Sequence, residues 1–153
     1  MMATSPEPST GTFDGSVHRL AVRVYFEDTD LSGVVYHANY LRWYERARSE
    51  FLRLLGIEQR AVQEAGEGAY ALADLTIRYL LPARLDDAVV IETRVEDLRA
   101  ASVRMHQQAW RGSELLTDAR LRVGFIGPDG RPRRQPEMWR KALTAITLSE
   151  RPQ

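Results

Sequence analysis

The chain has 153 residues, of which 44% are hydrophobic and 27% charged, and this suits one domain with its own core. The charges of its 21 basic and 21 acidic side chains cancel, and a net charge of zero argues against a nucleic-acid-binding protein. The absence of cysteine excludes disulfides, thiol catalysis and cysteine-ligated metal sites. No run is apolar for long enough to span a bilayer, so we expect a cytoplasmic protein.

The two ends of the chain differ from its middle. Residues 1–17 are rich in Ser, Thr, Pro and Gly, and they lack the basic start and apolar stretch of a signal peptide. We therefore expect a disordered N-terminal tail over 1–17, one domain over 18–145 and a C-terminal tail over 146–153.

In the first half of the domain, the spacing of apolar residues changes from every second residue to the spacing of a helix. Alternation from Leu20 to Phe26 predicts a strand with one buried face. Turn-forming residues then interrupt the pattern over 27–33. From 38 to 55 apolar residues recur at helical spacing, which predicts a long helix that ends before Gly56. A shorter helix is expected over 58–64. The stripe of the long helix comprises Tyr40, Tyr44, Ala47, Phe51 and Leu55.

The second half is predicted to be β-structure. Its four strands cover about 74–81, 89–96, 103–109 and 115–125, and short hairpin connections join the later ones. A short helix follows from Pro136 to Leu143. Because no crossover helices separate these strands, a doubly wound parallel sheet is excluded. The expected fold is α+β, a curved antiparallel five-stranded sheet around one long central helix.

The segment from Asp28 to Asn39 carries the densest chemistry. An aspartyl phosphotransferase would use Asp28-x-Asp30 after a strand, but that chemistry belongs to parallel α/β sheets. A calcium-binding loop would need a bidentate Glu at its twelfth position, where this chain has Asn39. Asp28 and Asp30 could also merely cap turns, which spacing alone favours.

A further alternative places a carboxylate beside the start of the long helix. Unpaired N–H groups at a helix N-terminus can bind a carbonyl oxygen and stabilise the oxyanion formed on attack. An ionised aspartate nearby can attack the carbonyl or activate water. His37 sits at this helix start, where a capping or packing role is its simplest alternative. His106 is predicted to be a surface residue.

Two stretches carry a resemblance to a known family. Residues Val22 to Tyr40, with Tyr44 to Arg48, closely resemble the hotdog-fold acyl-CoA thioesterases. The nearest likeness is the Tol–Pal-associated acyl-CoA thioesterase subfamily, which is related to 4-hydroxybenzoyl-CoA thioesterases. Tyr79 to Asp87 also looks like that family. The resemblance covers about residues 20–123.

The resemblance implies a hotdog fold whose subunits join edge to edge as a homodimer or homotetramer. By motif position it makes Asp30 the catalytic carboxylate, and it places the carbonyl-polarising backbone N–H at His37. It implies no cofactor and no metal. The substrate would be an acyl-CoA, with acyl carrier protein as another carrier. One departure stands out, because Phe26 occupies a position where the subfamily often has a catalytically helpful Tyr. Either that hydroxyl is dispensable, or Tyr25 or water substitutes for it, or the activity is altered.

We therefore expect hydrolysis of an acyl-CoA to free acid and coenzyme A. Asp30 and His37 are the catalytic candidates, and Tyr36, Tyr40 and Arg99 are the substrate-binding candidates, Arg99 for a phosphate of coenzyme A. Tyr40 also belongs to the helical stripe, which favours a place in the core. The rival hypotheses are a non-catalytic acyl-thioester or acyl-carrier-protein binding module on the same fold, and a structural partner of an envelope machine.

Overall fold

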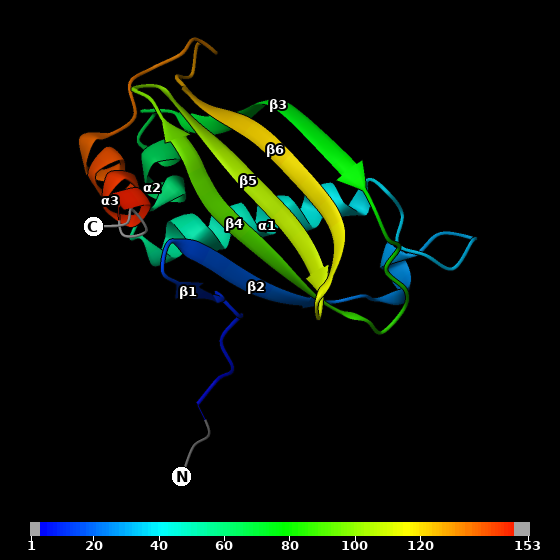
Figure 1. Cartoon of the computed structure of the whole chain (residues 1–153). Helices are drawn as coiled ribbons and strands as arrows, with labels where there is room; N and C mark the ends of the chain where they lie inside the picture. The colour runs from blue at the N-terminus through cyan, green and yellow to red at the C-terminus, as the bar shows by residue number, and fades with distance from the viewer. Residues whose placement is uncertain (1–3, 149–153) are drawn as a thin grey trace.

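The protein, described here over residues 4–148 by a computed structural model, consists of one antiparallel sheet and three helices (Figure 1). The strand order is β1-β2-β4-β5-β6-β3, which places β1 and β3 at the two edges. The strands are β1 (Thr12–Asp14), β2 (Val17–Arg23), β3 (Ala69–Tyr79), β4 (Ala88–Leu98), β5 (Ser102–Arg111) and β6 (Glu114–Ile126). The helices are α1 (Asn39–Leu54), α2 (Gln59–Glu64) and α3 (Glu137–Leu148), and a 3-10 turn, η1 (Phe26–Asp28), follows β2.

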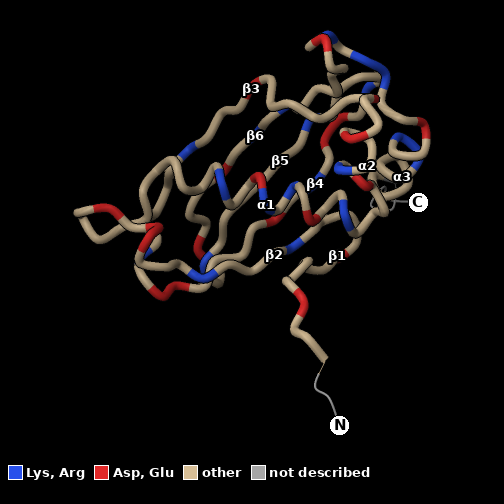
Figure 2. Tube along the Cα trace, turned by 180° about the vertical axis from the view of Figure 1, so that it is seen from behind, with Lys and Arg blue, Asp and Glu red and all other residues tan. Residues whose placement is uncertain are grey.

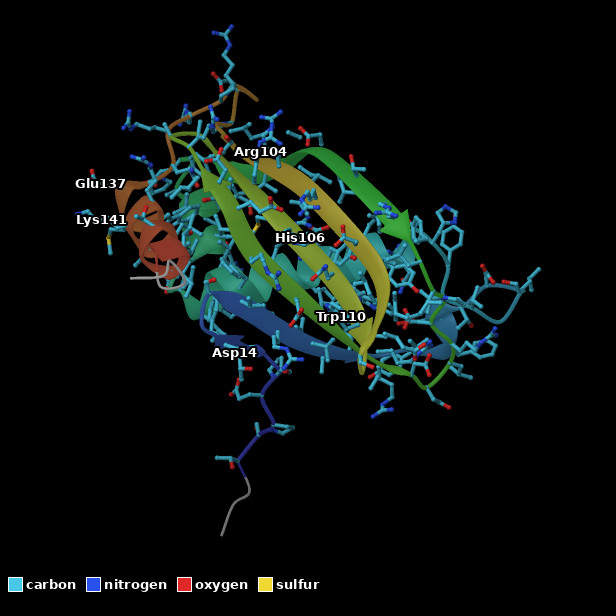
Figure 3. The ribbon with its side chains drawn as sticks, viewed as in Figure 1. Asp14, Arg104, His106, Trp110, Glu137 and Lys141 are labelled. Atoms are coloured by element: carbon cyan, nitrogen blue, oxygen red, sulfur yellow. The ribbon has the colours of Figure 1, made fainter. Side chains whose placement is uncertain are left out.

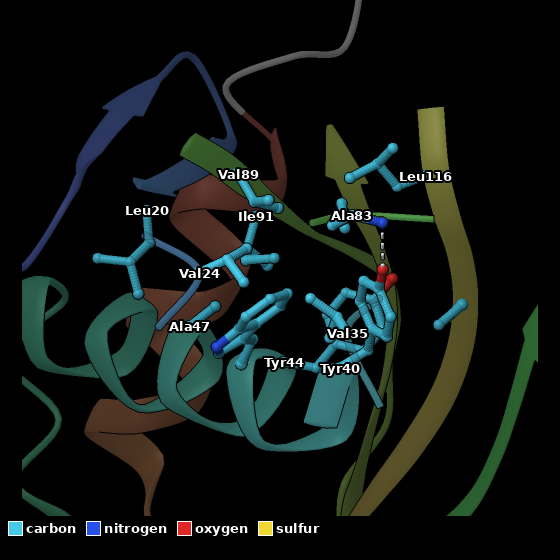
Figure 4. Packing of buried hydrophobic residues seen from close by; sticks show 13 residues of the cluster. Leu20, Val24, Val35, Tyr40, Tyr44, Ala47, Ala83, Val89, Ile91 and Leu116 are labelled. Atoms are coloured by element: carbon cyan, nitrogen blue, oxygen red, sulfur yellow. Dashed lines mark hydrogen bonds between the residues drawn. The ribbon is translucent and has the colours of Figure 1, made fainter. Parts of the chain in front are cut away.

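Helix α1 lies across one face of the curved sheet and buries the predicted aromatic stripe (Figure 1). Tyr44, Ala47 and Phe51 are fully buried, and Trp43, which the predicted stripe omitted, is only 1% exposed. The first half of the helix packs against β2 and β4 (Figure 4). The second half packs against β5, β6 and α3, where Trp139 and Leu143 complete the core. The long helix and the sheet that covers it are therefore as predicted.

The outer face of the sheet is polar because strand residues alternate between its two faces. Cross-strand ion pairs join Arg19 to Glu92 at 3.2 Å and Arg120 to Glu96 at 2.9 Å. Basic and acidic residues are interspersed over the molecule (Figure 2), so the balanced charge of the sequence is also balanced in space.

His106 corrects one prediction, because it is not a surface residue. It lies mid-strand on β5 (Figure 3), yet only 9% of it is exposed. Its Nε2 lies 2.7 Å from Asp118 Oδ1 on β6. Arg94 and Arg120 are its pairing partners on the two neighbouring strands.

The N-terminal segment is more ordered than predicted, and the sheet has six strands instead of five. The additional strand β1 pairs with β2, so the prediction of a disordered tail is wrong for residues 12–17. The Phe13 ring packs 5.3 Å from His18 and 5.2 Å from Phe51. At the other end α3 continues past residue 145, and residues 149–153 of the expected C-terminal tail lie outside the described residues.

The first predicted strand ends at Arg23, three residues earlier than the alternation suggested. The chain turns there because Asp28 Oδ2 accepts the N–H of Tyr25 at 2.7 Å, which closes η1. Phe26 therefore lies in this turn and is 82% exposed. The turn directs the following loop past the end of the sheet toward the start of α1 (Figure 1).

Candidate active site

The loop between η1 and α1 is a tight hairpin with Asp30 near its base. Thr29 and Val35 form a bridge, and the N–H of Asp30 donates to the carbonyl of Val34 at 2.9 Å. The N–H of Gly33 returns to the carbonyl of Asp30 at 3.0 Å. Gly33 has a φ of +82°, a conformation that glycine adopts without strain. Residue 30 therefore has a fixed backbone at the edge of the molecule.

The two aspartates of the motif have different roles. Asp28 is only 8% exposed, and its carboxylate accepts the N–H of Tyr25 and, at 3.1 Å, the side-chain amide of Asn39. Both bonds hold the loop against the first turn of α1. The capping interpretation of the sequence therefore applies to Asp28.

Asp30 by contrast has an exposed carboxylate. Its Oδ1 accepts the hydroxyl of Ser32 at 2.5 Å and the N–H of Ser32 at 2.9 Å. These bonds, the hydroxyl first, lower the pKa of Asp30, and the charge of His37 adds to the effect. Asp30 is thus ionised at neutral pH, as a nucleophile or a base must be.

The start of α1 leaves backbone N–H groups unused. No side chain caps the helix, whose N-cap residue is Ala38. The N–H of Tyr36 donates to Asp28 at 2.9 Å and that of Asn39 to Tyr36 at 2.8 Å. Among residues 4–148 no acceptor meets the N–H of His37 or Ala38. These free donors lie at the positive end of the helix dipole, where an oxyanion would be stabilised.

His37 lies on the surface beside these donors. Its ring centroid is 4.4 Å from that of Tyr36 and 6.3 Å from that of Tyr79. Its carbonyl accepts the hydroxyl of Tyr79 at 2.8 Å. A shallow pocket of about 280 Å³ opens here between the start of α1 and the end of β3, and its apolar wall includes Val35 and Leu81. The structure therefore brings Asp30, His37 and Tyr36 to one end of the molecule.

The other two candidates lie in different surroundings. Tyr40 forms part of the pocket wall but is 2% exposed, and its hydroxyl accepts the N–H of Ala83 at 3.3 Å (Figure 4). Arg99 lies in the β4–β5 turn, at the opposite end of the sheet from the Asp30 loop (Figure 1). Its guanidinium pairs with Asp97 at 3.0 Å. One protomer therefore does not bring Arg99 to Asp30, and its phosphate contact stays a prediction.

A second, more enclosed cavity of about 240 Å³ follows α1 away from the site. Leu52, Leu75 and Met105 are among its apolar lining, between α1 and the edge strand β3. Arg48 also lines it and donates to the side-chain oxygen of the fully buried Gln107 at 2.9 Å. This cavity has the apolar character that an acyl chain requires.

Sequence reasoning missed Tyr79 as a residue of the site. The residue lies within the predicted strand over 74–81, and the alternation of that strand says only which face of the sheet Tyr79 shares. Its contact with a carbonyl on another element depends on how the end of β3 meets the start of α1. The available signal was its place in the second stretch of family resemblance, 79–87.

Over residues 4–148, no group of three His, Cys, Asp or Glu side chains is arranged to hold a metal ion. In the same part of the chain, no helix is both long and apolar enough to cross a membrane.

Comparison with known proteins agrees with this architecture. The thioesterase superfamily matches residues 32–117. The acyl-CoA thioesterase YbgC of Haemophilus influenzae is 41% identical over 105 residues, which are 69% of this chain and 77% of that protein. The acyl-CoA thioester hydrolase YbgC of Escherichia coli O157:H7 is 40% identical over 114 residues, 74% of this chain and 84% of that protein.

Solved structures show the same fold. A probable thioesterase from Bartonella henselae superposes with a TM-score of 0.75 at 37% identity, covering 78% of this chain and 99% of that one. A 4-hydroxybenzoyl-CoA thioesterase mutant superposes with a TM-score of 0.76 at 22% identity, covering 84% of this chain and 99% of that one; this match concerns the fold alone. The chain therefore belongs to the thioesterase superfamily and is a thioester hydrolase of the hotdog fold.

Proposed function

We propose that this enzyme hydrolyses acyl-CoA thioesters to free acid and coenzyme A at the Asp30 loop. The observation that carries the proposal is an exposed, ionised carboxylate next to a helix start where, within residues 4–148, the N–H groups of His37 and Ala38 lack acceptors. A carboxylate supplies the attack, and the N–H groups stabilise the charge that develops on the carbonyl oxygen. The names of the relatives from Haemophilus and Escherichia support acyl-CoA as the substrate.

Two routes are open to Asp30. In the first its carboxylate oxygen bonds to the thioester carbon, the C–S bond breaks, and water then hydrolyses the resulting anhydride. In the second Asp30 takes a proton from water while the water oxygen bonds to that carbon. In both routes the thiolate of coenzyme A leaves and takes up a proton. The carbonyl oxygen is held by the N–H groups at His37 and Ala38.

Phe26 has no part in either route. Its ring is 82% exposed in η1 and carries no group that can donate a hydrogen bond. Tyr25, beside it, is 59% exposed. The proposed chemistry needs only the carboxylate and the backbone donors, so it tolerates phenylalanine where the subfamily often has tyrosine.

We also propose that the acyl group extends from the site along α1, into the cavity beside β3. Tyr36 is exposed and its ring packs against that of His37, which lines the pocket, and Tyr40 forms part of the pocket wall. Coenzyme A would stay outside. Because acyl-CoA is an intracellular metabolite, the proposed reaction places the enzyme in the cytoplasm.

A second copy of the chain is expected to complete the site. Edge strand β3 has 11 residues and pairs with β6 on one side only. The unpaired backbone N–H and C=O groups of an edge strand of this length can pair with a strand of another chain. Leu72, Tyr79 and Leu81 are each more than 40% exposed along this edge or next to it. We infer a homodimer joined through β3, which could pair again into a homotetramer.

The rival function is an acyl-thioester or acyl-carrier-protein binding module without catalysis. A thiol-release assay over short, long and aromatic acyl-CoA substrates separates the two. We expect steady release of coenzyme A for at least one class. Saturable binding of the same substrates with no release above the uncatalysed rate would instead establish the binding module.

A further inference from the structure

Within residues 4–148, Tyr79 is the one side chain from the sheet with a hydrogen bond to the backbone at the start of α1. It is the last residue of β3, and its hydroxyl donates to the carbonyl of His37 at 2.8 Å. Its ring packs edge-on against Tyr40, with centroids 5.8 Å apart. Burial raises the pKa of Tyr79, so its hydroxyl stays protonated and can donate throughout the neutral range.

The carbonyl that Tyr79 holds belongs to the peptide group between His37 and Ala38. That group is planar and trans, so its C=O and N–H point in opposite directions. Fixing the carbonyl of His37 therefore also fixes the direction of the Ala38 N–H. This N–H has no acceptor among residues 4–148. A hydrogen bond to the carbonyl also polarises the peptide group and strengthens its N–H as a donor.

We propose that Tyr79 is a positioning residue, whose hydroxyl orients and polarises the Ala38 N–H, one of the two proposed donors to the thioester oxygen. The inference rests on the proposed function, and it adds a residue to which neither sequence reasoning nor the comparisons assigned a role. The hydroxyl does not touch substrate. Its effect reaches the substrate through one peptide group.

The matched test is Tyr79→Phe, which removes the hydroxyl and keeps the ring contacts with Tyr40 and His37. The aim of the N–H matters most when negative charge develops on the oxygen, so kcat should fall while KM changes little. Loss of a whole oxyanion donor costs about 100- to 1,000-fold in kcat, so we expect a loss of about 10- to 100-fold from a misdirected one. The melting temperature should stay close to that of the wild type, because the substitution removes one hydroxyl and keeps the ring contacts.

Tyr44→Phe is the control. It removes another tyrosine hydroxyl, which bonds to Thr117 inside the core, about one and a half turns after the start of α1. This variant should lose stability and keep its kcat. If Tyr79→Phe keeps the wild-type kcat, or raises KM without lowering kcat, the positioning role is wrong. If the wild type releases no coenzyme A from any substrate, the proposed function fails, whatever Tyr79 does.

Discussion

At the scale of single residues, the site depends on a division of labour between two aspartates that look equivalent in sequence. Asp28 is buried and bonds to Tyr25 and Asn39, which ties the loop to α1. Asp30 is exposed, and within residues 4–148 its carboxylate accepts hydrogen bonds only from Ser32. The motif therefore combines a structural carboxylate with a chemically available one.

The bond from Ser32 sets the pH range of Asp30. Because the Ser32 hydroxyl lowers the pKa of Asp30, the active carboxylate form persists to lower pH than for an ordinary aspartate, and activity is lost as the pH falls through that lowered pKa. Ser32→Ala should raise the pKa and move the acid limb of kcat/KM to higher pH. The pH profile, with Ser113→Ala in the β5–β6 turn as control, measures this. Superimposable acid limbs for all three proteins would refute it.

At the scale of elements, strand β1 closes over a buried histidine. His18 is fully buried, its Nε2 lies 2.7 Å from the carbonyl of Thr10, and its Nδ1 has no partner among the described residues. The rings of Phe13 and Phe51 pack against it. A proton on Nδ1 would therefore be buried without an acceptor.

This environment makes the folded protein sensitive to acid. Burial lowers the pKa of His18, so the unfolded chain, with a pKa of about 6.5, binds a proton more readily. The stabilisation is present above that pH and is lost as the pH falls below it. His18→Phe, which suits the aromatic cluster, should reduce the fall in melting temperature between about pH 7.5 and about pH 5.5. An equal fall in both proteins would contradict this.

Elements also show what could be predicted from sequence. The bounds of α1 were predicted to within a residue, because its stripe of aromatic residues repeats at 3.6 over four turns. Strand β1 was missed because three residues carry no usable period, and Phe13 holds it through tertiary contacts. His106 was misplaced because cross-strand neighbours bury it. Such contacts join residues far apart in the chain, and periodicity does not report them.

The same limit applies to the candidate site. Motif position alone pointed to Asp30 and His37, and the structure places both at one end of the molecule, beside the start of α1. Their catalytic roles stay predictions. Tyr79 could not be predicted as a site residue, because its hydrogen bond to His37 joins residues that are 42 positions apart in sequence. Arg99 was suggested by chemistry without any information on distance, and the sheet places it at the far end.

At the scale of the whole molecule, the edge strand β3 ends at the proposed active site, because its last residue, Tyr79, bonds to His37 beside the start of α1. Leu72→Glu would place a charge on this edge, at a leucine that is 48% exposed. We expect the wild type to elute as a dimer or tetramer, and this variant to elute as a monomer with little turnover. Leu54→Glu on α1, at a leucine 42% exposed, is the control that should keep the assembly. Light scattering after size exclusion measures both, and an oligomeric Leu72→Glu protein would exclude β3 as the interface.

The most direct test of the account is the rate of coenzyme A release by Asp30→Asn, compared with wild type and with Asp86→Asn. Asp86 is another exposed aspartate, with a φ of +70° that asparagine tolerates, so it controls for the lost charge. We predict that Asp30→Asn keeps the wild-type fold and assembly but releases no coenzyme A above background, while Asp86→Asn keeps full activity. Wild-type turnover by the Asp30→Asn protein would contradict the central claim.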